Sequence, residues 1–589
     1  MAELEQALVG RLQAAVEAAF GEEFIGTDPL VRPAQDPSFG DYQANLAMGL
    51  ARELGRPARE VAAAIVEHLD LAGMCHAPEV AGPGFINLRF LPGYLAERVA
   101  ELAGDPRLGV EEVADPQRVV IEYLNPNAAR QMHVGHLRST VIGDALARIV
   151  DFLGHEVIRE SHMGDWGTQF GLLIEHLIEL GREDEVGFAD LNQLYRQAQH
   201  RFNSDPDFAD RARKRVVALQ SGDERTLGVW RDMIEESVRH FGEIYRRLGV
   251  TPVEMRGESF YNPMLPEVVS ELEAKGLTQV SEGAVCVFPP GFTRPNGEPL
   301  PLIVQKSDGG YLYATTDLAA IRYRIFELGA ERVVYVVDAR QSLHLAMVFA
   351  TARLAGWMAQ GMAQGMAQGM DREVAAEHCS FGAVLGEDGR PLKTRAGENV
   401  RLAELLDESE QRAAAIVGEK NPALDEERRR RVAHAVGIGA LKYADLSTYR
   451  VKDYVFSWDR MLAMDGNTAP YLQYAYARIR SIFRRGELGP EELGSVGELA
   501  IEHPAERALV LQLGRLPPTV RGVAATLEPH RLCSYLYEVA TAFSSFYEQC
   551  PVLQAGERQR TSRLVLCDLT ARTLGLGLGL LGIEVLERM

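Results

Sequence analysis

Two histidines three positions apart, His133 and His136, are the residues of this chain best suited to electrostatic chemistry. Side chains at i and i+3 share one face of a helix, so both imidazoles can reach one ligand. A zinc site would need further ligands, and the cysteine spacing offers none. A helix-start pair without function is the other alternative. Gly135, between the two, leaves room for a flat ring or a backbone to approach.

Acidic and aromatic side chains suggest a second half to the site. Glu122 lies near the end of an apolar stretch, where a carboxylate is costly unless loop amides satisfy it or a cation pairs with it. Asp317 falls in the first turn of an expected helix, where the helix dipole alone could stabilise it. Tyr313, at the end of an expected strand, would face the same pocket. Carboxylates and a tyrosine together suit a substrate with a planar cation.

Lys393 is the third candidate, in the loop sequence Lys393-Thr394-Arg395-Ala396-Gly397. The glycine and proline just before it, Gly389 and Pro391, mark a turn, and on local grounds a solvated turn is favoured. Its value therefore depends on its distance from the histidines.

A strand, a loop, a helix and a second strand must position these groups. Residues 118–123 are short, apolar and β-branched, as in a buried strand. Apolar residues at helical spacing follow over 137–153 and end at Gly154, and a second strand fits 156–159. In an open parallel sheet, ligands gather at the carboxyl ends of strands, where a helix N-terminus attracts phosphate. An anionic nucleotide is therefore expected beside the histidines.

Composition limits the class of protein. At 589 residues the chain should form several domains, and its net charge of −21 argues against non-specific binding of nucleic acid by the whole surface. We see no secretory signal and no apolar run of the ~20 residues that a membrane span needs. The six cysteines are scattered without CxxC pairs and suit reduced thiols in the cytoplasm.

The N-terminal third contains a small domain and then the sheet. Residues 1–112 read as a separate domain, with helices at 4–19, 44–54 and 58–69, a strand at 85–90 and a linker over 104–116.

Further along, three kinds of segment are expected. Residues 182–250 are mostly helical and charged, and 281–316 form an antiparallel excursion that ends in a hairpin turn at 308–310. A helix starts near 316, and residues 333–337 form a central parallel strand. Three copies of Met-Ala-Gln-Gly over 358–369 read as a surface loop or helix extension.

After residue 400 the pattern is helical. Residues 470–485 place Tyr471, Tyr474 and Arg478 on one face. Further helices fit 531–549 and 558–574. The glycine–leucine alternation over 575–580 is a poor helix interior by propensity.

Several motifs resemble those of one family. His133-Val134-Gly135-His136 resembles the HIGH signature of class I aminoacyl-tRNA synthetases, and Lys393-Thr394-Arg395 resembles a degenerate form of their second signature, KMSKS. Longer stretches resemble arginyl-tRNA synthetases over essentially the whole chain, apart from the repeat tract. They are residues 122–127, 133–140, 161–167, 311–317, 337–341, 466–474 and 581–585.

The resemblance implies an activity. Such enzymes condense L-arginine with ATP, accompanied by Mg²⁺, to arginyl-adenylate and then pass the arginyl group to the terminal adenosine of tRNA(Arg). Members generally need tRNA for the first step. Motif matching gives an arginine set of Glu122, Asn127, Glu258, Tyr313, Asp317 and Gln341. It gives an ATP set of His133, Gly135, His136, His162, Gly164, Asp165 and Lys393, of which His133, His136 and Lys393 are catalytic.

The resemblance also implies an organisation. We expect an α/β fold, with a Rossmann-like parallel-sheet catalytic domain, a small α+β N-terminal domain and an all-α C-terminal domain. The boundaries fall at 1–112, 113–400, 401–465 (a helical connection) and 466–589 (the anticodon-binding domain). Tyr471, Tyr474 and Arg478 are the candidates for tRNA contact, although buried tyrosines are the alternative for the first two. A monomer without zinc, a tightly bound cofactor or a membrane segment is expected.

The sequence departs from the family pattern at one place and leaves two rival functions. The second signature lacks a lysine, and Arg130 occupies a position where some relatives carry one. Arginine and lysine are not equivalent there.

The first rival is a small-molecule nucleotidyltransferase, which would not need the long helical tail. The second is a non-catalytic RNA-binding relative, which would not need the histidines and the acidic residues.

Overall fold

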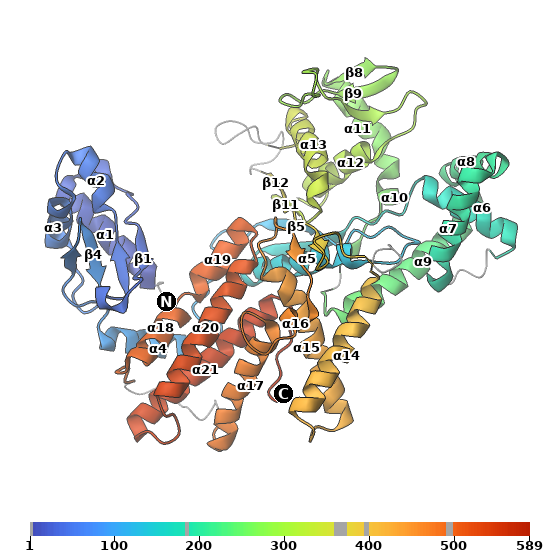
Figure 1. Ribbon diagram of the computed structural model, residues 1–589. Coiled ribbons are helices and arrows are strands. Elements are labelled where there is room, and N and C mark those ends of the chain that lie inside the picture. Colours follow the sequence, from blue (N-terminus) through green and yellow to red (C-terminus); the bar gives the residue numbers. More distant parts are fainter. Residues whose placement is uncertain (1–3, 183–187, 252, 359–373, 394–399, 490–498) are drawn as a thin grey trace.

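The computed structural model describes residues 4–182, 188–251, 253–358, 374–393, 400–489 and 499–589 (Figure 1). The repeat at 359–369 and residues 394–397 of the second signature lie outside these ranges. Among the described residues, no helix is both long enough and apolar enough to cross a membrane. All six cysteines are free and buried, as expected of reduced thiols.

The N-terminal segment is a small α+β unit, as predicted. Its antiparallel sheet has the order β1-β2-β4-β3. The strands are β1 (Val31–Pro33), β2 (Tyr42–Ala44), β3 (Glu79–Ala81) and β4 (Phe85–Leu88), and the helices are α1 (Leu4–Phe20), α2 (Ala47–Leu54), α3 (Ala58–His68) and α4 (Pro92–Gly104). The sequence predicted α1–α3 and β4 but not α4 or the other strands. Arg507 Nε donates to Asp41 Oδ1 at 2.7 Å and fastens this unit to the C-terminal helices.

The central sheet is parallel throughout, with the order β12-β11-β5-β6-β7. Its strands are β5 (Arg118–Glu122), β6 (Glu156–Ser161), β7 (Glu254–Met255), β11 (Arg332–Tyr335) and β12 (Ala375–His378). The chain adds β6 and β7 on one side of β5, then returns to add β11 and β12 on the other. The strand order therefore reverses between β5 and β11, which is where an open α/β sheet forms its ligand crevice.

Helix α5 (Val134–Phe152) follows β5 and packs its apolar stripe into the core. Its core-facing side chains include Leu137, Val141 and Ile149, and the chain turns at Gly154 with φ +91° before β6. The predicted strand–loop–helix–strand unit is confirmed. The helix begins beside the carboxyl end of β5, and so its N-terminus lies at the crevice.

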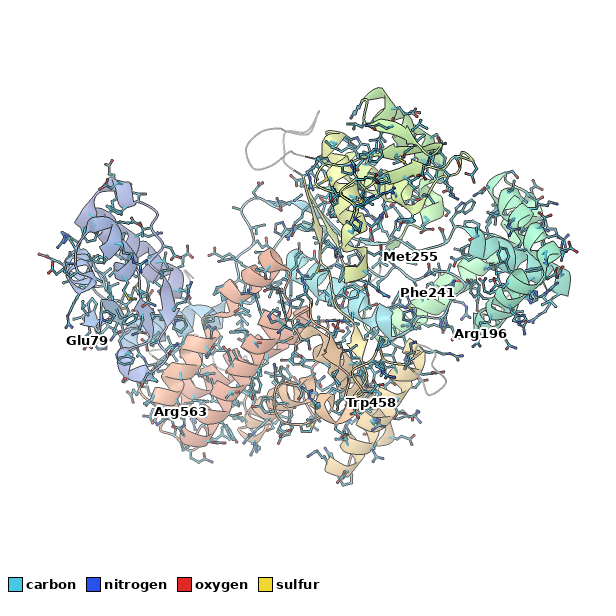
Figure 2. All side chains as sticks on the ribbon, turned by 45° about the horizontal axis from the view of Figure 1, so that its top comes forward. Glu79, Arg196, Phe241, Met255, Trp458 and Arg563 are labelled. Atoms are coloured by element: carbon cyan, nitrogen blue, oxygen red, sulfur yellow. The ribbon has the colours of Figure 1, made fainter. Side chains whose placement is uncertain are left out.

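Two insertions interrupt the strand and helix alternation. The first is helical, as predicted: α6 (Thr168–Leu180), α7 (Phe188–Ser204), α8 (Pro206–Gln220) and α9 (Glu224–Arg247). The second contains α10 (Glu258–Tyr261), α11 (Leu265–Ala274) and an antiparallel sheet of β8 (Thr278–Ser281), β9 (Ala284–Val287) and β10 (Leu302–Gln305). The N-terminal unit, with Glu79, and the helical insertion, with Arg196, lie at opposite ends of the molecule (Figure 2).

The segment after β10 differs from the prediction. A turn does occur at Asp308–Gly310, with the N–H of Lys306 donating to the carbonyl of Gly310, but it does not lead into a strand. Instead Tyr313 is the first residue of α12 (Tyr313–Phe326). Tyr313 and Asp317 therefore lie one helical turn apart on one face, which is a more direct reason for them to share a pocket than the predicted strand end.

The rest of the chain is mostly helical, as predicted. The helices are α13 (Ser342–Leu354), α14 (Leu402–Lys420), α15 (Glu426–Leu446), α16 (Trp458–Met461), α17 (Ala469–Arg485), α18 (Pro504–Leu513), α19 (Leu516–Thr526), α20 (His530–Gln549) and α21 (Glu557–Leu580). A short parallel pair, β13 (Val384–Leu385) and β14 (Tyr454–Val455), joins the catalytic part to them. In Figure 1 α13 lies beside α12 and the second insertion, whereas α15, α17 and α21 lie beneath the sheet.

The glycine-rich stretch is helical after all, because α21 runs to Leu580. A Cβ at Gly577 would clash with the side chain of Leu536 on α20, and one at Gly575 would lie 3.4 Å from the ring of Tyr476 on α17. Gly577 thus lets α20 and α21 approach closely, whereas the contact at Gly575 is an ordinary one. The packing at Gly577 outweighs its poor intrinsic helix propensity.

Helix α5 is fastened to the C-terminal helices by a buried ion pair, beside which a buried lysine lies close to an acidic residue of α5. Arg138 Nε lies 3.1 Å from Asp445 Oδ2, with both side chains almost fully buried. Lys442 Nζ donates to the carbonyl of Gly582 at 2.6 Å, beside Asp144 of α5. Separating the two partners of a buried ion pair would leave an uncompensated buried charge, which is strongly destabilising. The pair therefore fixes the position of α5 relative to the C-terminal helices.

Candidate active site

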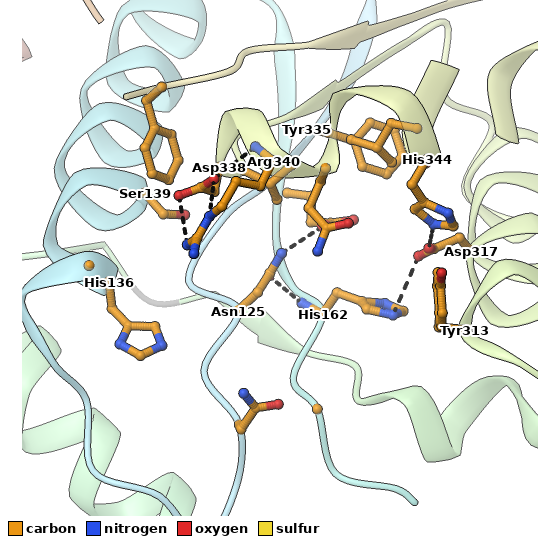
Figure 3. Close-up of a pocket in the computed structure, with 18 of the residues that line it drawn as sticks. Asn125, His136, Ser139, His162, Tyr313, Asp317, Tyr335, Asp338, Arg340 and His344 are labelled. Carbon is orange, nitrogen blue, oxygen red and sulfur yellow. Dashed lines mark hydrogen bonds and ion pairs between the residues drawn. The ribbon is translucent and has the colours of Figure 1, made fainter. Parts of the chain in front are cut away.

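A cavity of about 450 Å³ opens at the carboxyl ends of β5 and β11. Both halves of the expected site line it. From the sequence-based candidates they are Glu122, Asn127, His133, Gly135, His136, His162, Gly164, Glu258, Tyr313, Asp317 and Gln341. Figure 3 shows His136 on one side, Asp317 and Tyr313 on the other, and Asn125 and His162 between them. The volume is in the range of small-ligand sites.

The histidine pair caps α5. His133 is the N-cap residue, its Nδ1 accepts the N–H of Gly135 at 3.1 Å, and the Nδ1 of His136 accepts the N–H of His133 at 3.0 Å. The ring centroids are 4.0 Å apart. Since both Nδ1 atoms accept, each neutral ring carries its proton on Nε2. The pair therefore offers two N–H donors next to a helix N-terminus, which is an arrangement for binding an anion.

Both imidazoles are neutral at physiological pH. Burial, with a contribution from His133, lowers the pKa of His136 to about 3. Burial also lowers the pKa of His133, and the positive charges of Arg340 and Arg130 lower it further. The rings therefore act as hydrogen-bond donors and not as cations.

Gly135 is required by the ring of His133. A Cβ at this position would lie 2.8 Å from His133 Cε1, closer than such atoms approach in proteins. The flat group for which this glycine leaves room is thus the neighbouring imidazole. The sequence indicated the need for space but not its occupant.

The floor between the two halves is made by the loops after β5 and β6. The N–H of His162 donates to Asn125 Oδ1 at 2.9 Å, and the N–H of Ala128 donates to the carbonyl of Gly164 at 2.9 Å. Leu124 and Ala129 have φ values of +63° and +60°, which non-glycine residues rarely adopt. Strained backbone of this kind persists where the surroundings fix it, often at functional sites.

Glu122 receives both an amide and a cation. Asn125 Nδ2 donates to its Oε1 at 2.7 Å, and Arg324 Nη1 lies 2.6 Å from its Oε2. Arg324 is fully buried and also pairs with Glu160 at 3.0 Å. The cation therefore comes from the protein itself, while Glu122 still presents part of its surface to the cavity.

Glu258 is held by Asp165. The carboxylate of Asp165 accepts the N–H of Ser259 at 2.8 Å and its hydroxyl at 2.5 Å, and this fixes the first turn of α10. Burial, followed by the negative charges of Asp165 and Asp317, raises the pKa of Glu258 to about 7. A cation entering the cavity would reverse that effect by favouring the ionised form.

Asp317 lies between two histidines. His344 Nε2 is 2.5 Å from its Oδ2, and His162 Nε2 is 3.9 Å from its Oδ1. The ring of Tyr313 meets the ring of His344 edge to face at 4.7 Å. With Glu258 nearby, this side of the cavity carries negative charge, as a site for a guanidinium requires.

Three of the expected basic or acidic groups do not line the cavity. Asp165 is committed to Ser259, as described above. Arg130 stacks over the ring of Tyr195 at 4.4 Å. Lys393 is exposed at the last described position before residue 400. The chain resumes at Val400, whose carbonyl accepts the N–H of Val134 at 2.9 Å. Seven residues after Lys393 the chain therefore lies at the start of α5.

Sequence reasoning missed several lining residues. They are Asn125, Ser139, Tyr335, Val337, Asp338, Arg340, His344, Leu345 and Phe381. Arg340 is 89% exposed and its guanidinium Nε lies 2.8 Å from Asp338 Oδ1. Asp338, Arg340 and His344 could have been found, because they follow the predicted strand at 333–337, whose carboxyl end is a ligand edge. Phe381 comes from beyond β12, and no sequence signal indicates it.

The three candidate RNA contacts lie on α17, far along the chain from the cavity. Tyr474 is 47% exposed. Tyr471 is half-buried, with its ring 5.9 Å from that of Tyr537. Arg478 packs over the ring of Tyr547 at 4.5 Å. The predicted common face exists, but of these three residues only Tyr474 is exposed.

Comparisons with known proteins agree on one family. The family described as "tRNA synthetases class I (R), catalytic domain" matches residues 99–458, "Arginyl tRNA synthetase N terminal domain" matches 4–90, and "DALR anticodon binding domain" matches 472–589. A protein named arginine–tRNA ligase from Thermobifida fusca is 53% identical over 596 residues, covering 100% of both chains. The one from Synechococcus elongatus is 51% identical over 98% of each.

Solved structures give the same result. The crystal structure of arginyl-tRNA synthetase from Plasmodium falciparum is similar with a TM-score of 0.86 at 28% identity, and that from Thermus thermophilus with 0.80 at 26%. Both matches cover 100% of each chain. The likeness therefore extends over the N-terminal unit, the sheet with its insertions and the helical part.

Proposed function

The chain belongs to the arginyl-tRNA synthetase family and is an arginine–tRNA ligase, and we propose how its residues serve ATP, L-arginine and tRNA(Arg). The observation that carries the proposal is the single cavity lined both by the N–H donors at the start of α5 and by the carboxylates of Glu258 and Asp317. A triphosphate and a guanidinium can lie side by side there, as the joining of arginine to ATP requires.

The histidine side of the cavity takes the ATP phosphates. The arginine carboxylate attacks the α-phosphorus, pyrophosphate leaves, and arginyl-adenylate remains. Nε2–H groups of His133 and His136 donate to the phosphate oxygens as negative charge shifts toward the leaving group, which is electrostatic stabilisation without a covalent enzyme intermediate. Mg²⁺ accompanies the ATP through its phosphate oxygens. Gly135, His162 and Gly164 complete the ATP surface.

The acidic side takes L-arginine. Asp317, Glu258 and Tyr313 bind the guanidinium, with Gln341 beside them, since planar forks of donors match carboxylates. Asn127 and Glu122 face the α-carboxylate and α-amino groups. Asp165 does not contact the substrate, but its hydrogen bonds with Ser259 hold the turn that carries Glu258.

Lys393 reaches the phosphates from its loop. The support is the hydrogen bond between Val134 and Val400, which places Val400, seven residues after Lys393, at the start of the HIGH helix. Arg340 is a second basic group on the cavity wall, whereas Arg130 is occupied by Tyr195. We assign Lys393 as a phosphate ligand. Arg340, which lines the cavity where Arg130 does not, is the candidate that replaces the lysine missing from the second signature.

RNA recognition is assigned to the two ends of the chain. The N-terminal unit contacts the corner of tRNA, and the C-terminal helices read the anticodon through exposed rings and arginines, as single-stranded RNA is usually read. Tyr474 is the leading candidate, followed by Arg478 and Tyr471. We also propose a monomer working in the cytoplasm. The free, buried cysteines suit reduced thiols.

Aminoacylation with radiolabelled arginine tests the ligase activity directly. ATP–pyrophosphate exchange with and without tRNA tests whether adenylate formation needs tRNA, as members of the family generally do. Exchange at the full rate without tRNA would overturn that part of the proposal. The rival nucleotidyltransferase is set aside, because an anticodon-binding domain matches residues 472–589. The non-catalytic rival is set aside by full-length similarity to ligases.

A further inference from the structure

We infer that His344 is a positioning residue that orients Asp317 and Tyr313 toward the guanidinium of the substrate. The inference rests on the role proposed for Asp317 and adds a residue that the sequence reasoning did not select. His344 is the third residue of α13, on the β11 side of the cavity, and it lines the cavity wall.

One imidazole contacts both predicted guanidinium ligands. Its Nε2 lies 2.5 Å from Asp317 Oδ2, and its ring centroid is 4.7 Å from that of Tyr313 with the planes at 60°. The two partners are four residues apart on α12, whereas His344 comes from another helix. His344 therefore contacts both side chains from outside their own helix. Figure 3 shows the three side chains together at one end of the cavity.

The hydrogen bond fixes the carboxylate. An ionised carboxylate only accepts, and so Nε2 of His344 carries the proton that is donated to Oδ2. This donation stops rotation about the terminal bond of Asp317. Oδ1 has only a longer contact among the described residues, 3.9 Å to His162 Nε2. Oδ1 thus keeps its capacity to accept an N–H of the guanidinium.

Tyr313 needs such a neighbour. It is exposed, with 62% of the residue accessible. An exposed tyrosine samples several rotamers, and ordering one of them on binding costs affinity. The edge contact with His344 holds the ring over the cavity before the substrate arrives. His344 therefore raises affinity for arginine by preorganising both ligands.

The test compares His344→Ala, His344→Gln, Asp317→Asn and the double variant His344→Ala/Asp317→Asn in the full-length enzyme with tRNA present. Steady-state aminoacylation gives KM and kcat for arginine and KM for ATP, and thermal unfolding monitors the fold. Leu343→Ala is the matched control, because Leu343 is the neighbouring residue on α13 and is 57% exposed. Gln is included because its amide can donate one N–H and thus replace part of the function.

For His344→Ala we expect KM for arginine to rise about tenfold, as for the loss of a hydrogen bond to a charged group. We expect kcat and KM for ATP to change by less than about threefold. Gln should restore part of the affinity, and Leu343→Ala should behave as the unmodified enzyme. In the Asp317→Asn background, His344→Ala should add little, because the two act on one contact.

Four results would overturn the inference. The first is an unchanged KM for arginine in His344→Ala alongside a raised KM for arginine in Asp317→Asn. The second is an equal rise of KM for arginine and for ATP in His344→Ala, together with a lowered unfolding temperature. The third is a KM for arginine in His344→Gln that is as high as in His344→Ala, and the fourth is a double variant in which the two effects on KM for arginine add fully. If Asp317→Asn itself leaves KM for arginine unchanged, the role proposed for Asp317 fails first, and the inference fails with it. The single and double variants thus separate the two failures.

Discussion

The Nδ1 atom of His136 accepts a hydrogen bond of 3.0 Å from the backbone N–H of His133. The contact completes the cap of α5 and leaves Nε2–H as the donor of the ring. Because burial lowers the pKa of His136 to about 3, this donor is a neutral imidazole throughout the physiological range. One hydrogen bond thus closes the helix end and sets the tautomer of a proposed phosphate ligand.

Replacing His136 with alanine should cut adenylate formation by on the order of 10²-fold or more, the usual effect of deleting a donor at a developing negative charge. The ring lines the cavity, whereas the proposed anticodon contacts lie on α17, and so tRNA binding should remain nearly intact. Pyrophosphate exchange and filter binding of tRNA measure the two quantities. Equal losses in both would mean that the substitution disrupts the fold and not the proposed phosphate contact.

Gly135→Ala should separate the site from the fold. Alanine near the start of a helix ordinarily stabilises it, by up to about 1 kcal/mol relative to glycine. Here its Cβ would meet the ring of His133, whose far end can turn away. We expect an unfolding temperature that is unchanged or slightly higher, together with at least about a tenfold loss in pyrophosphate exchange, since a displaced ligand is costly. Full activity would contradict the assigned position of His133.

Arginine binding should weaken in acid because of Glu258. Its pKa of about 7 is raised by burial and by the charges of Asp165 and Asp317, so that the side chain is largely protonated and neutral at pH 6. A guanidinium favours the ionised form. The dissociation constant for arginine should therefore be about tenfold higher at pH 6 than at pH 8.

Calorimetry in buffers of different ionisation enthalpy measures the linked proton. At pH 7 about half a proton should leave the protein for each arginine bound. Glu258→Gln is the control, and it should remove both the proton release and most of the pH dependence. The same pH dependence in the glutamine variant would assign it to another group.

The sequence was sufficient to predict the central part of the molecule. The apolar run ending at Glu122, the helix ending before Gly154 and the glycine between the histidines are local signals, and each corresponds to a local feature of the structure. The apolar strand before Asp338 was equally clear. Since parallel strands bring their carboxyl ends to one edge, these local signals were enough to place two halves of one site together.

What the sequence could not predict depends on contacts between distant segments. The cation beside Glu122 is Arg324, about two hundred positions later, and nothing local to either residue indicates the pairing. The brace between His344 and Asp317 joins two helices. Gly577 has a poor helix propensity, and nothing local to it indicates that Leu536 of α20 needs the space. Tyr313 was placed on a strand because a turn signal preceded it, although α12 begins at that residue.

Asp317→Ala should chiefly weaken the selection of arginine. Arginine carries a charged guanidinium where citrulline carries a neutral urea group, and a site with an ionised carboxylate favours the cation. Removing that carboxylate should reduce the ratio of kcat/KM for arginine over citrulline by on the order of tenfold or more. Aminoacylation with each amino acid measures the ratio. An unchanged ratio would refute the role proposed for Asp317.

Two tyrosines on one face of α17 offer the sharpest test of RNA binding. Tyr474 is 47% exposed, whereas Tyr471 is half-buried against Tyr537. A base stacked on an aromatic ring is worth about 1–3 kcal/mol. Tyr474→Ala should therefore raise KM for tRNA about tenfold while the unfolding temperature stays constant, and Tyr474→Phe, which keeps the ring, should behave as the unmodified enzyme. Tyr471→Ala should instead lower the unfolding temperature, because it removes packing between α17 and α20. If Tyr474→Ala leaves KM for tRNA unchanged, its exposed ring is an ordinary surface residue and the contact with RNA lies elsewhere on the helical domain.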